Sequence, residues 1–367
     1  MDIVVEVGRP IQAAIDAAHQ RGGGRVVLAP GVHPSATLFL ASRVELHLPA
    51  GAVLQGVSDP WAYSDFRDPG FDDIAPEGSR KCLIAAAGAE DVAITGGGRI
   101  DGAGPAFYDT NVPAGQWFAK PPHPRPRMVQ FYNCRNVRFE GVSFVDSPGW
   151  TFWLIGCEDV FIRGIRVLGC QQMINNDGID IDGCRRVVVS DSVFRTGDDC
   201  LVLRAIPKGP DRQAVCEGVI VTNCVLDSRC QGIRVGCPSD DTIRNCVFSN
   251  IVFRGLGNGI NINNPRRYLR PGCTGYLDLR DILFTNMVID SAEVPVWINV
   301  EEGVRLRYLG GMTFANLRLR SDCPCKLQGS PETTIEDVLF SQVRCSRPIE
   351  MTRTRRVRFN EVEVQES

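Results

Sequence analysis

Two adjacent aspartates, Asp198 and Asp199, stand between a glycine and an apolar run in the segment TGDDCLVLR. Neighbouring carboxylates repel one another, and partial burial adds a cost of desolvation. A turn is the simplest interpretation, because Gly-Asp-Asp is ordinary turn chemistry. A third aspartate, Asp177, precedes a comparable apolar run in NNDGIDIDGC. If the fold brings the three together, their pKa values should separate, and the group could perform acid–base catalysis.

The composition restricts the classes of protein that could carry this chemistry. The chain has 367 residues, of which 44% are hydrophobic and 23% are charged, as in an ordinary globular protein. A net charge of −3 provides no basic field for nucleic acid, and no apolar run reaches the length of a membrane span. We therefore expect neither nucleic acid nor a membrane as partner, and the oligomeric state stays open.

The cysteines do not suggest a metal site or a disulfide framework. There are 15 of them, an odd number, without the paired spacing of a zinc ribbon. We therefore expect no cofactor and no metal. The start, MDIVVEVGRP, lacks a basic segment followed by an apolar one, so no signal peptide is expected. Many reduced thiols and the missing leader favour a cytoplasmic protein, although a secreted chain whose leader had been removed would read the same.

A repeated pattern determines the expected fold. The pattern is apolar-x-apolar-x-x-apolar-x-apolar, often with Gly, Asn or Asp fifth, and it predicts two short strands that meet at a bend. Successive copies start 19 to 36 residues apart, with no helical pattern between them, which favours stacked coils of strand. A β-propeller would need longer units of four strands. The copies are 137–144, 160–167, 187–194, 219–226, 246–253, 282–289, 312–319, 338–345 and 357–364.

The expected fold class is therefore all-β, a right-handed parallel β-helix (solenoid) with a short N-terminal capping helix. The helix begins at Pro10 in PIQAAIDAAHQRGGG, and its apolar face would cover the open first coil. That face consists of Ile11, Ala14, Ile15 and Ala18. We expect a single β-helix domain over residues 1–367, with the cap and first coils in 1–60 and the main coils in 80–367.

A stack of small residues should line the interior of the coils. Four cysteines each precede a repeat by three residues, so they should occupy equivalent inward positions as small buried hydrophobes. They are Cys134, Cys157, Cys184 and Cys216.

Apolar pairs before the repeats set a register between coils. Aligning pairs such as Ile179/Ile181 with Leu201/Leu203 places Asp177 and Asp199 at the strand entrances of adjacent coils, about 4.8 Å apart, with Asp198 beside them. A second column points outward from mid-strand: Gln130, Trp153, Asp180, Val202, Arg234, Asn261 and Trp297. A third column lies two residues further: Tyr132, Ile155, Asp182, Arg204, Gly236, Asn263 and Asn299.

Three converging carboxylates suit acid–base cleavage of a glycosidic bond. Trp153 and Trp297 in the outward column could stack on sugar rings, although a surface aromatic beneath a loop explains each of them equally well. Asp182 and Arg204 would be neighbours, which predicts an ion pair of small energetic value. A calcium site is the weaker explanation of the acidic cluster, because no Asp-x-Asp-x-Asp loop surrounds it.

These motifs resemble those of glycoside hydrolase family 28, the polygalacturonases and their relatives, over most of the chain. NNDGIDID resembles the family's Asn-Thr-Asp motif, and TGDDC matches its Asp-Asp motif. The resemblance implies inverting hydrolysis, with Asp198 as general acid and with Asp177 and Asp199 activating water. A spacing of about 4.8 Å is nearer to the carboxylate separation of retaining enzymes, so the stereochemical outcome stays open.

The chain departs from the family where substrate would bind. The Gly-His-Gly motif falls on a segment in which Gln231 replaces the histidine, and the Arg-Ile-Lys motif falls on one in which Asn261 and Asn263 replace both cations. In the family those cations hold the carboxylate of galacturonate, a contact that asparagine cannot reproduce. Arg204, Arg234 and Tyr276, which resembles a substrate-contacting tyrosine, complete the candidates for substrate binding.

The sequence thus predicts a glycoside hydrolase acting on a plant- or microbe-derived poly- or oligosaccharide other than plain polygalacturonate. A neutral or deoxy sugar such as rhamnose, galactose or arabinose is expected at the cleavage site. Two alternatives stay open: a polysaccharide lyase on the same scaffold, with Arg127 or Arg234 as base, and a carbohydrate-binding protein with decayed catalysis. The sugar, the linkage and endo or exo action are not determined.

Overall fold

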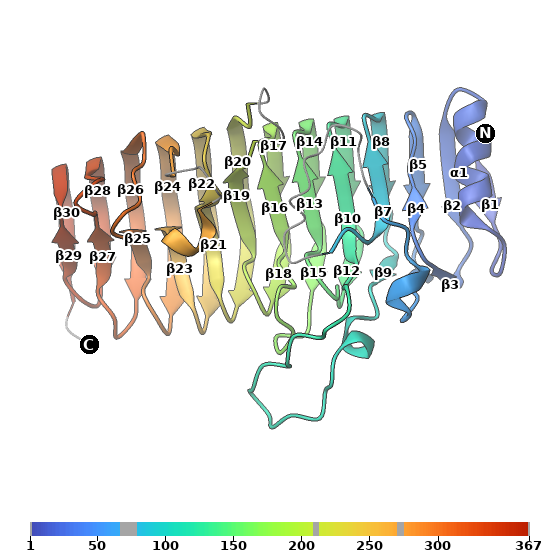
Figure 1. Cartoon of the computed structure of the whole chain (residues 1–367), viewed down its shortest axis with the longest axis horizontal. Helices are drawn as coiled ribbons and strands as arrows, with labels where there is room; N and C mark the ends of the chain where they lie inside the picture. Colours follow the sequence, from blue (N-terminus) through green and yellow to red (C-terminus); the bar gives the residue numbers. More distant parts are fainter. Residues whose placement is uncertain (1, 67–78, 208–212, 270–274, 366–367) are drawn as a thin grey trace. The chain divides into compact units, whose positions relative to one another are not determined.

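A computed structural model describes residues 2–66, 79–207, 213–269 and 275–365. The chain divides into two compact units, each built mostly of stacked parallel strands (Figure 1). Unit 1 comprises Met1–Asp180 and Val187–Asp198, and unit 2 comprises Ile181–Arg186 and Asp199–Ser367. The strands β16 (Ile179–Asp182) and β17 (Arg185–Ser190) contain boundaries between the two.

Unit 1 contains three parallel ribbons of short strands. Its strands are β1 (Ile3–Val5), β2 (Gly24–Leu28), β3 (Gly31–Ser35), β4 (Leu38–Phe39), β5 (Val44–His47), β6 (Ala52–Gly56), β7 (Cys82–Ala87), β8 (Glu90–Thr95), β9 (Arg99–Asp101), β10 (Arg127–Tyr132), β11 (Arg135–Glu140), β12 (Ser143–Val145), β13 (Phe152–Ile155), β14 (Glu158–Arg163), β15 (Arg166–Leu168) and β18 (Val193–Thr196). One ribbon stacks β2, β5, β8, β11 and β14. A second stacks β3, β6, β9, β12, β15 and β18, and a third stacks β4, β7, β10 and β13. The short 3-10 helices η1 (Pro60–Ala62) and η3 (Gly104–Phe107) lie in connections.

Unit 2 contains two parallel ribbons. Its strands are β19 (Leu201–Ala205), β20 (Cys216–Ser228), β21 (Gln231–Ser239), β22 (Thr242–Gly255), β23 (Asn258–Asn264), β24 (Asp278–Ser291), β25 (Val296–Val300), β26 (Tyr308–Arg320), β27 (Cys325–Gln328), β28 (Ile335–Cys345), β29 (Ile349–Thr352) and β30 (Thr354–Val364), with a 3-10 helix η4 (Arg266–Tyr268). The long even-numbered strands β20 to β30 stack on one another, and the odd-numbered strands β19 to β29 form the other ribbon. The prediction of an all-β fold of parallel coils is confirmed.

The N-terminal helix is also confirmed. Helix α1 (Ile11–Gln20) follows Pro10, whose φ of −69° suits a helix start. It packs on β1, β2 and β4 (Figure 1) and buries the predicted apolar face of Ile11, Ala14, Ile15 and Ala18. Among the described residues no helix is long and apolar enough to cross a membrane.

The bend of each repeat has one backbone conformation. The fifth residue of every copy has a positive φ, with values from 52° at Glu361 to 77° at Gly141. L-residues avoid this left-handed region, whereas Gly, Asn and Asp tolerate it, which explains their recurrence there. The set is Gly141, Gly164, Asp191, Asn223, Asn250, Asn286, Asn316, Gln342 and Glu361.

In unit 2 the bend residues bond to one another from coil to coil. Asn286 Nδ2 donates to Asn250 Oδ1 at 3.2 Å, and Asn316 Nδ2 donates to Asn286 Oδ1 at 2.8 Å. Beside this ladder, phenylalanines of successive repeats stack with ring centres 4.9 to 5.6 Å apart. Both columns repeat at the spacing of the strands, and they therefore favour the same register.

The predicted mid-strand column is confirmed within each unit, whereas the register shifts between Leu203 and Ala205, so that the step from Arg204 to Gly236 in the third column is not observed. In unit 1, Gln130 lies beside Trp153 across β10 and β13. In unit 2, Arg234 follows Val202 in the column, and Asn261 and Trp297 come next. The four cysteines before the repeats are buried, at most 1% exposed, as predicted.

We expect Asn286→Ala to lower the free energy of unfolding more than Asn286→Gly does, by about 1 kcal/mol. Both variants lose the ladder bonds, but only alanine must hold a Cβ at a φ of 54°. Urea denaturation followed by circular dichroism measures the difference. An alanine variant as stable as the glycine variant would show that the bend imposes no backbone constraint.

Candidate active site

The turn that carries Asp198 lies in unit 1 and is held by a buried asparagine. Asn176 is fully buried, and its Oδ1 accepts hydrogen bonds from the backbone N–H groups of Gly197 at 2.8 Å and Asp198 at 3.1 Å. Its Nδ2 donates to the Cys170 carbonyl at 2.9 Å. Both the oxygen and the nitrogen of the Asn176 amide are hydrogen-bonded, and these bonds fix the position of the backbone at Gly197 and Asp198.

Position 197 requires glycine, because the 170–176 loop packs too closely against its backbone to leave room for a Cβ. A Cβ at this position would lie 2.3 Å from the Met173 carbonyl oxygen and 2.8 Å from Asn176 Oδ1. The glycine of the TGDD motif therefore permits the turn to pack against the 170–176 loop, beyond any preference of the turn itself.

The carboxylate of Asp198 is oriented by Asn175. The backbone N–H of Asn175 donates to Asp198 Oδ2 at 3.1 Å, and Nδ2 of Asn175 lies 3.5 Å from the same oxygen. Asn175 has a φ of 56°, a conformation that asparagine tolerates better than most residues. The sequence interpretation missed Asn175 and Asn176, although both stand directly before Asp177 in the recognised motif.

A buried arginine and a tyrosine support this loop. Arg125 is 4% exposed, and its Nη2 donates to Asn175 Oδ1 at 2.9 Å while Nη1 donates to the Tyr108 hydroxyl oxygen at 2.7 Å. Burial raises the pKa of Tyr108, Arg125 opposes that effect, and the charges of Asp198 and Asp177 add to it. Asp198 and Asp177, both in unit 1, therefore each raise the pKa of the same tyrosine. No pattern in the sequence pointed to Arg125 or Tyr108.

In unit 2, Asp199 forms a buried ion pair with Arg234. Nη1 of Arg234 lies 3.0 Å from Asp199 Oδ2, and the two side chains are 11% and 1% exposed. Nη2 of Arg234 donates to Cys237 Sγ at 3.2 Å, and the guanidinium lies 5.8 Å from the centre of the Tyr268 ring. Burial lowers the pKa of Arg234, but the charges of Asp199 and Cys237 and the hydrogen bond to Asp199 together outweigh burial, so the pKa is raised well above its usual value. Arg234 is thus a permanent cation.

Gln231, which the sequence aligned with the histidine of the Gly-His-Gly motif, takes part in an amide ladder. Gln231 is partly exposed, and its Oε1 accepts a hydrogen bond from Asn258 Nδ2 at 2.9 Å. Asn258 Oδ1 accepts in turn from the Val294 N–H at 3.0 Å. These bonds fix the orientation of both amides.

Asn261 and Asn263, which the sequence aligned with the cations of the Arg-Ile-Lys motif, differ in exposure. Asn261 is 2% exposed, and within the part of the chain that the structure describes its Oδ1 accepts no hydrogen bond. Asn263 is partly exposed and accepts from Asn299 Nδ2 at 3.3 Å. Trp297, next to Asn261 in the column, is partly exposed, and its Nε1 donates to Gln328 Oε1 at 2.9 Å. Tyr276 is 48% exposed.

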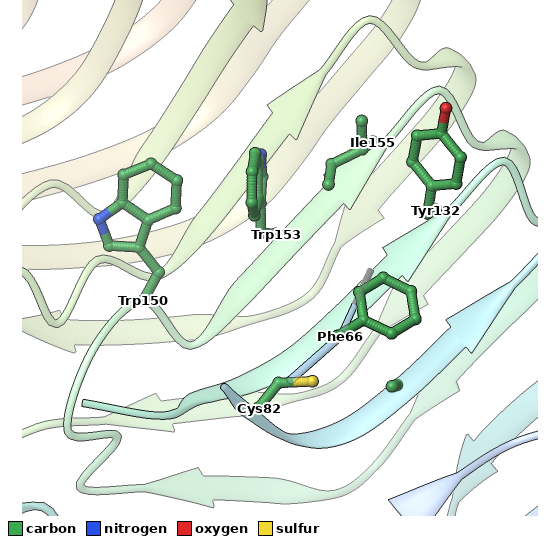
Figure 2. Packing of buried hydrophobic residues seen from close by; sticks show 7 residues of the cluster. Phe66, Cys82, Tyr132, Trp150, Trp153 and Ile155 are labelled. Carbon is green, nitrogen blue, oxygen red and sulfur yellow. The ribbon is translucent and has the colours of Figure 1, made fainter. Parts of the chain in front are cut away.

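Of the two interpretations of Trp153, stacking on a sugar ring is wrong, because the side chain is covered. Trp153 is 1% exposed and packs edge-on against Trp150, with ring centres 5.6 Å apart (Figure 2). The Arg127 guanidinium lies over both rings, at 5.0 Å from Trp150 and 4.7 Å from Trp153. Trp153 therefore offers no open face to a sugar, because large neighbours cover it. The cluster also contains Phe66, Cys82, Ala85, Tyr132 and Ile155.

Arg204 and Asp182 belong to the buried part of unit 2. Arg204 is 5% exposed, and its carbonyl accepts a hydrogen bond from the Gly183 N–H at 2.9 Å. Asp182 Oδ1 accepts from the Ile206 N–H at 2.9 Å and so fixes the backbone after β19. Their ion pair stays a prediction, and so does substrate contact by Arg204.

With this geometry established, comparison with known proteins identifies the family. The model of the glycosyl hydrolases family 28 matches residues 71–301, well over half of the chain. This chain belongs to glycosyl hydrolase family 28. A probable polygalacturonase of Arabidopsis thaliana is 29% identical over 214 residues, which cover 57% of this chain and 41% of that protein. The chain spans about half the length of the curated relatives it matches.

Solved structures support the fold. An exopolygalacturonase of Thermotoga maritima has a TM-score of 0.77 at 24% identity, covering 99% of this chain and 92% of that one. The polygalacturonase of Erwinia carotovora has a TM-score of 0.72 at 17% identity, covering 99% and 96%. At these identities the likeness concerns the β-helix fold, and the chemistry of this family 28 member has to be argued from its residues.

We expect Arg234→Met to destabilise the fold by about 3–5 kcal/mol, because it leaves the Asp199 carboxylate buried without its cation. Arg267→Met is the matched control: Arg267 is exposed and lies over the same Tyr268 ring at 4.8 Å, so it should cost far less. Denaturant unfolding measures both. Adding Asp199→Asn to Arg234→Met should recover part of the loss, and an unchanged loss would contradict a buried ion pair.

Proposed function

We propose that this family 28 member hydrolyses a glycosidic bond in a pectic poly- or oligosaccharide. Asp198 protonates the departing glycosidic oxygen, and Asp177 and Asp199 activate the attacking water. The single observation that carries the proposal is the Asp198 carboxylate, which lies in the family's motif and is fixed by Asn175 and Asn176. The expected stereochemistry is inversion, as the family resemblance implies.

The surroundings of Asp198 suit an acid that must deliver a proton in one direction. Its side chain is partly exposed, whereas Asp177 is 2% exposed and Asp199 is 1% exposed. A partly exposed carboxyl group on a fixed turn can reach a leaving oxygen. Asp177 and Asp199 are each more isolated from bulk water than Asp198 is. This difference in environment supports different roles for chemically identical groups.

The substrate that we propose is not plain polygalacturonate but a chain with a neutral or deoxy sugar at the cleavage site. Asn261 and Asn263 stand where the family has cations, and amides hydrogen-bond hydroxyl groups in either direction. Arg234 is a cation beside Asn261 in the column, but its guanidinium is already bound to Asp199. A substrate carboxylate would have to compete for it, at a cost in desolvation.

We expect Asp198→Asn to abolish turnover of an unactivated substrate and to leave the fold intact, because the amide keeps the shape but has no proton of suitable acidity to give. Asp191→Asn, a change at an exposed bend with a φ of 55°, is the control and should retain wild-type activity. Release of reducing sugar and circular dichroism are the measurements. Substantial residual activity in Asp198→Asn would contradict the assignment, and an unsaturated, ultraviolet-absorbing product would indicate a lyase.

We expect kcat/KM on polygalacturonate to be lower than on a matched neutral-sugar glycoside by roughly a hundredfold or more, the scale of losing two hydrogen bonds to charged groups. A kinetic comparison on pectic fragments of defined sugar composition tests this expectation. Equal or faster cleavage of polygalacturonate would overturn the neutral-substrate proposal without affecting the assignment of Asp198.

A further inference from the structure

We propose that Arg125 is a positioning residue for the general acid. Acting through Asn175, it directs two N–H donors onto one oxygen of Asp198, so that the catalytic proton is carried by the other oxygen. This inference rests on the proposed function, because it assumes that Asp198 is the acid. Arg125, Asn175 and Asp198, whose contacts carry the inference, all lie in unit 1.

The guanidinium of Arg125 is buried in a polar cage. It is 4% exposed, and it donates to the Ile174 carbonyl at 2.8 Å, the Tyr108 hydroxyl at 2.7 Å and Asn175 Oδ1 at 2.9 Å. Burying a cation is costly unless it is well hydrogen-bonded. Arg125 is a buried cation that binds the loop containing Ile174 and Asn175, next to the proposed acid Asp198. We infer that the geometry of this loop matters to the reaction.

The contact with Arg125 decides which way the Asn175 amide faces. An asparagine amide has an acceptor end and a donor end. Because Arg125 donates to Oδ1, the NH2 group faces the opposite side, where it lies 3.5 Å from Asp198 Oδ2. The Asn175 backbone N–H reaches the same Oδ2 at 3.1 Å. Two donors therefore converge on Oδ2, and the cation behind them strengthens the amide donor by polarising it.

This arrangement has a defined consequence for the proton transfer. A carboxyl oxygen that accepts hydrogen bonds from two N–H groups is disfavoured as the site of protonation. In the protonated form of Asp198, the proton therefore resides on Oδ1. In the reaction the Oδ1–H bond breaks as the glycosidic oxygen takes the proton. The bond from that oxygen to the anomeric carbon breaks with its electron pair, and water supplies the new hydroxyl group while its second proton passes to the aspartate that acts as base. The charge left on Asp198 is stabilised by the donors already in place on Oδ2.

The backbone of Asn175 allows the side-chain link to be cut without removing the loop's conformation. Its φ of 56° is accessible to glycine. Asn175→Gly therefore keeps the backbone donor to Oδ2 and removes the amide that connects Arg125 to Asp198. Asn136→Gly is the matched control: Asn136 also has a positive φ, 52°, and its amide donates to Asp91 Oδ1 at 2.6 Å, outside the site described above.

The test compares Arg125→Met, Arg125→Lys, Asn175→Gly and Asn136→Gly on two glycosides of the same sugar. One has a poor leaving group, the natural sugar, and the other has a dinitrophenol leaving group that needs no protonation. We expect Arg125→Met and Asn175→Gly to lower kcat on the natural glycoside by roughly tenfold to a hundredfold, the range for a hydrogen bond to a charged group, and to leave the dinitrophenyl glycoside near the wild-type rate. Arg125→Lys should restore part of the loss, and Asn136→Gly should change neither rate.

The outcomes separate the two proposals. Equal loss on both glycosides, or no loss on either, overturns the role of Arg125 while the hydrolase proposal stands. A wild-type protein that cleaves neither glycoside overturns the proposed function and this inference with it. If Arg125→Met does not fold, the rates of Asn175→Gly on the two glycosides test the proposal by themselves. This variant keeps the arginine and the backbone donor in place.

Discussion

Parallel pairing between equivalent strands of successive coils is the constraint on which the other features depend. It brings Arg234 next to Asn261 and Gln130 next to Trp153, although the partners are 27 and 23 residues apart in sequence. A slip by one residue would turn every inward side chain outward, so the apolar pairs specify the register strongly. The left-handed bends and the asparagine ladder repeat at the same spacing, and they stabilise the same alignment.

The two adjacent aspartates are tolerated because each has its own surroundings. Asp198 receives hydrogen bonds from Asn175, whereas Asp199 is paired with the Arg234 guanidinium. Neutral N–H donors and a full cation affect a carboxylate differently. Two neighbouring groups of the same type can therefore take different parts in a reaction, and a turn alone would not need such distinct partners.

Two of the buried cations, Arg125 and Arg234, stand next to residues that our proposals assign to catalysis. Arg125 acts on the loop that holds Asp198, and Arg234 binds Asp199 directly. Positions 261 and 263 are asparagines, and Arg234 lies beside Asn261 on the neighbouring strand. Under our proposal, a cation that is bound to a carboxylate of the chain is less available to a substrate carboxylate, which favours a neutral sugar.

The sequence by itself determined the features that follow from a period. The repeats, the capping helix, the inward cysteines and the order of the columns all follow from apolar residues at regular intervals, since each coil must bury the same side chains against the next. Only the tertiary structure decided the contacts made by the loops that connect the strands, because the sequences of these loops have no repeating period. It buried Trp153 under Trp150 and joined Arg125 to Asn175, 50 residues away. Those contacts depend on how individual loops pack and which way each amide faces, and residue type does not encode either.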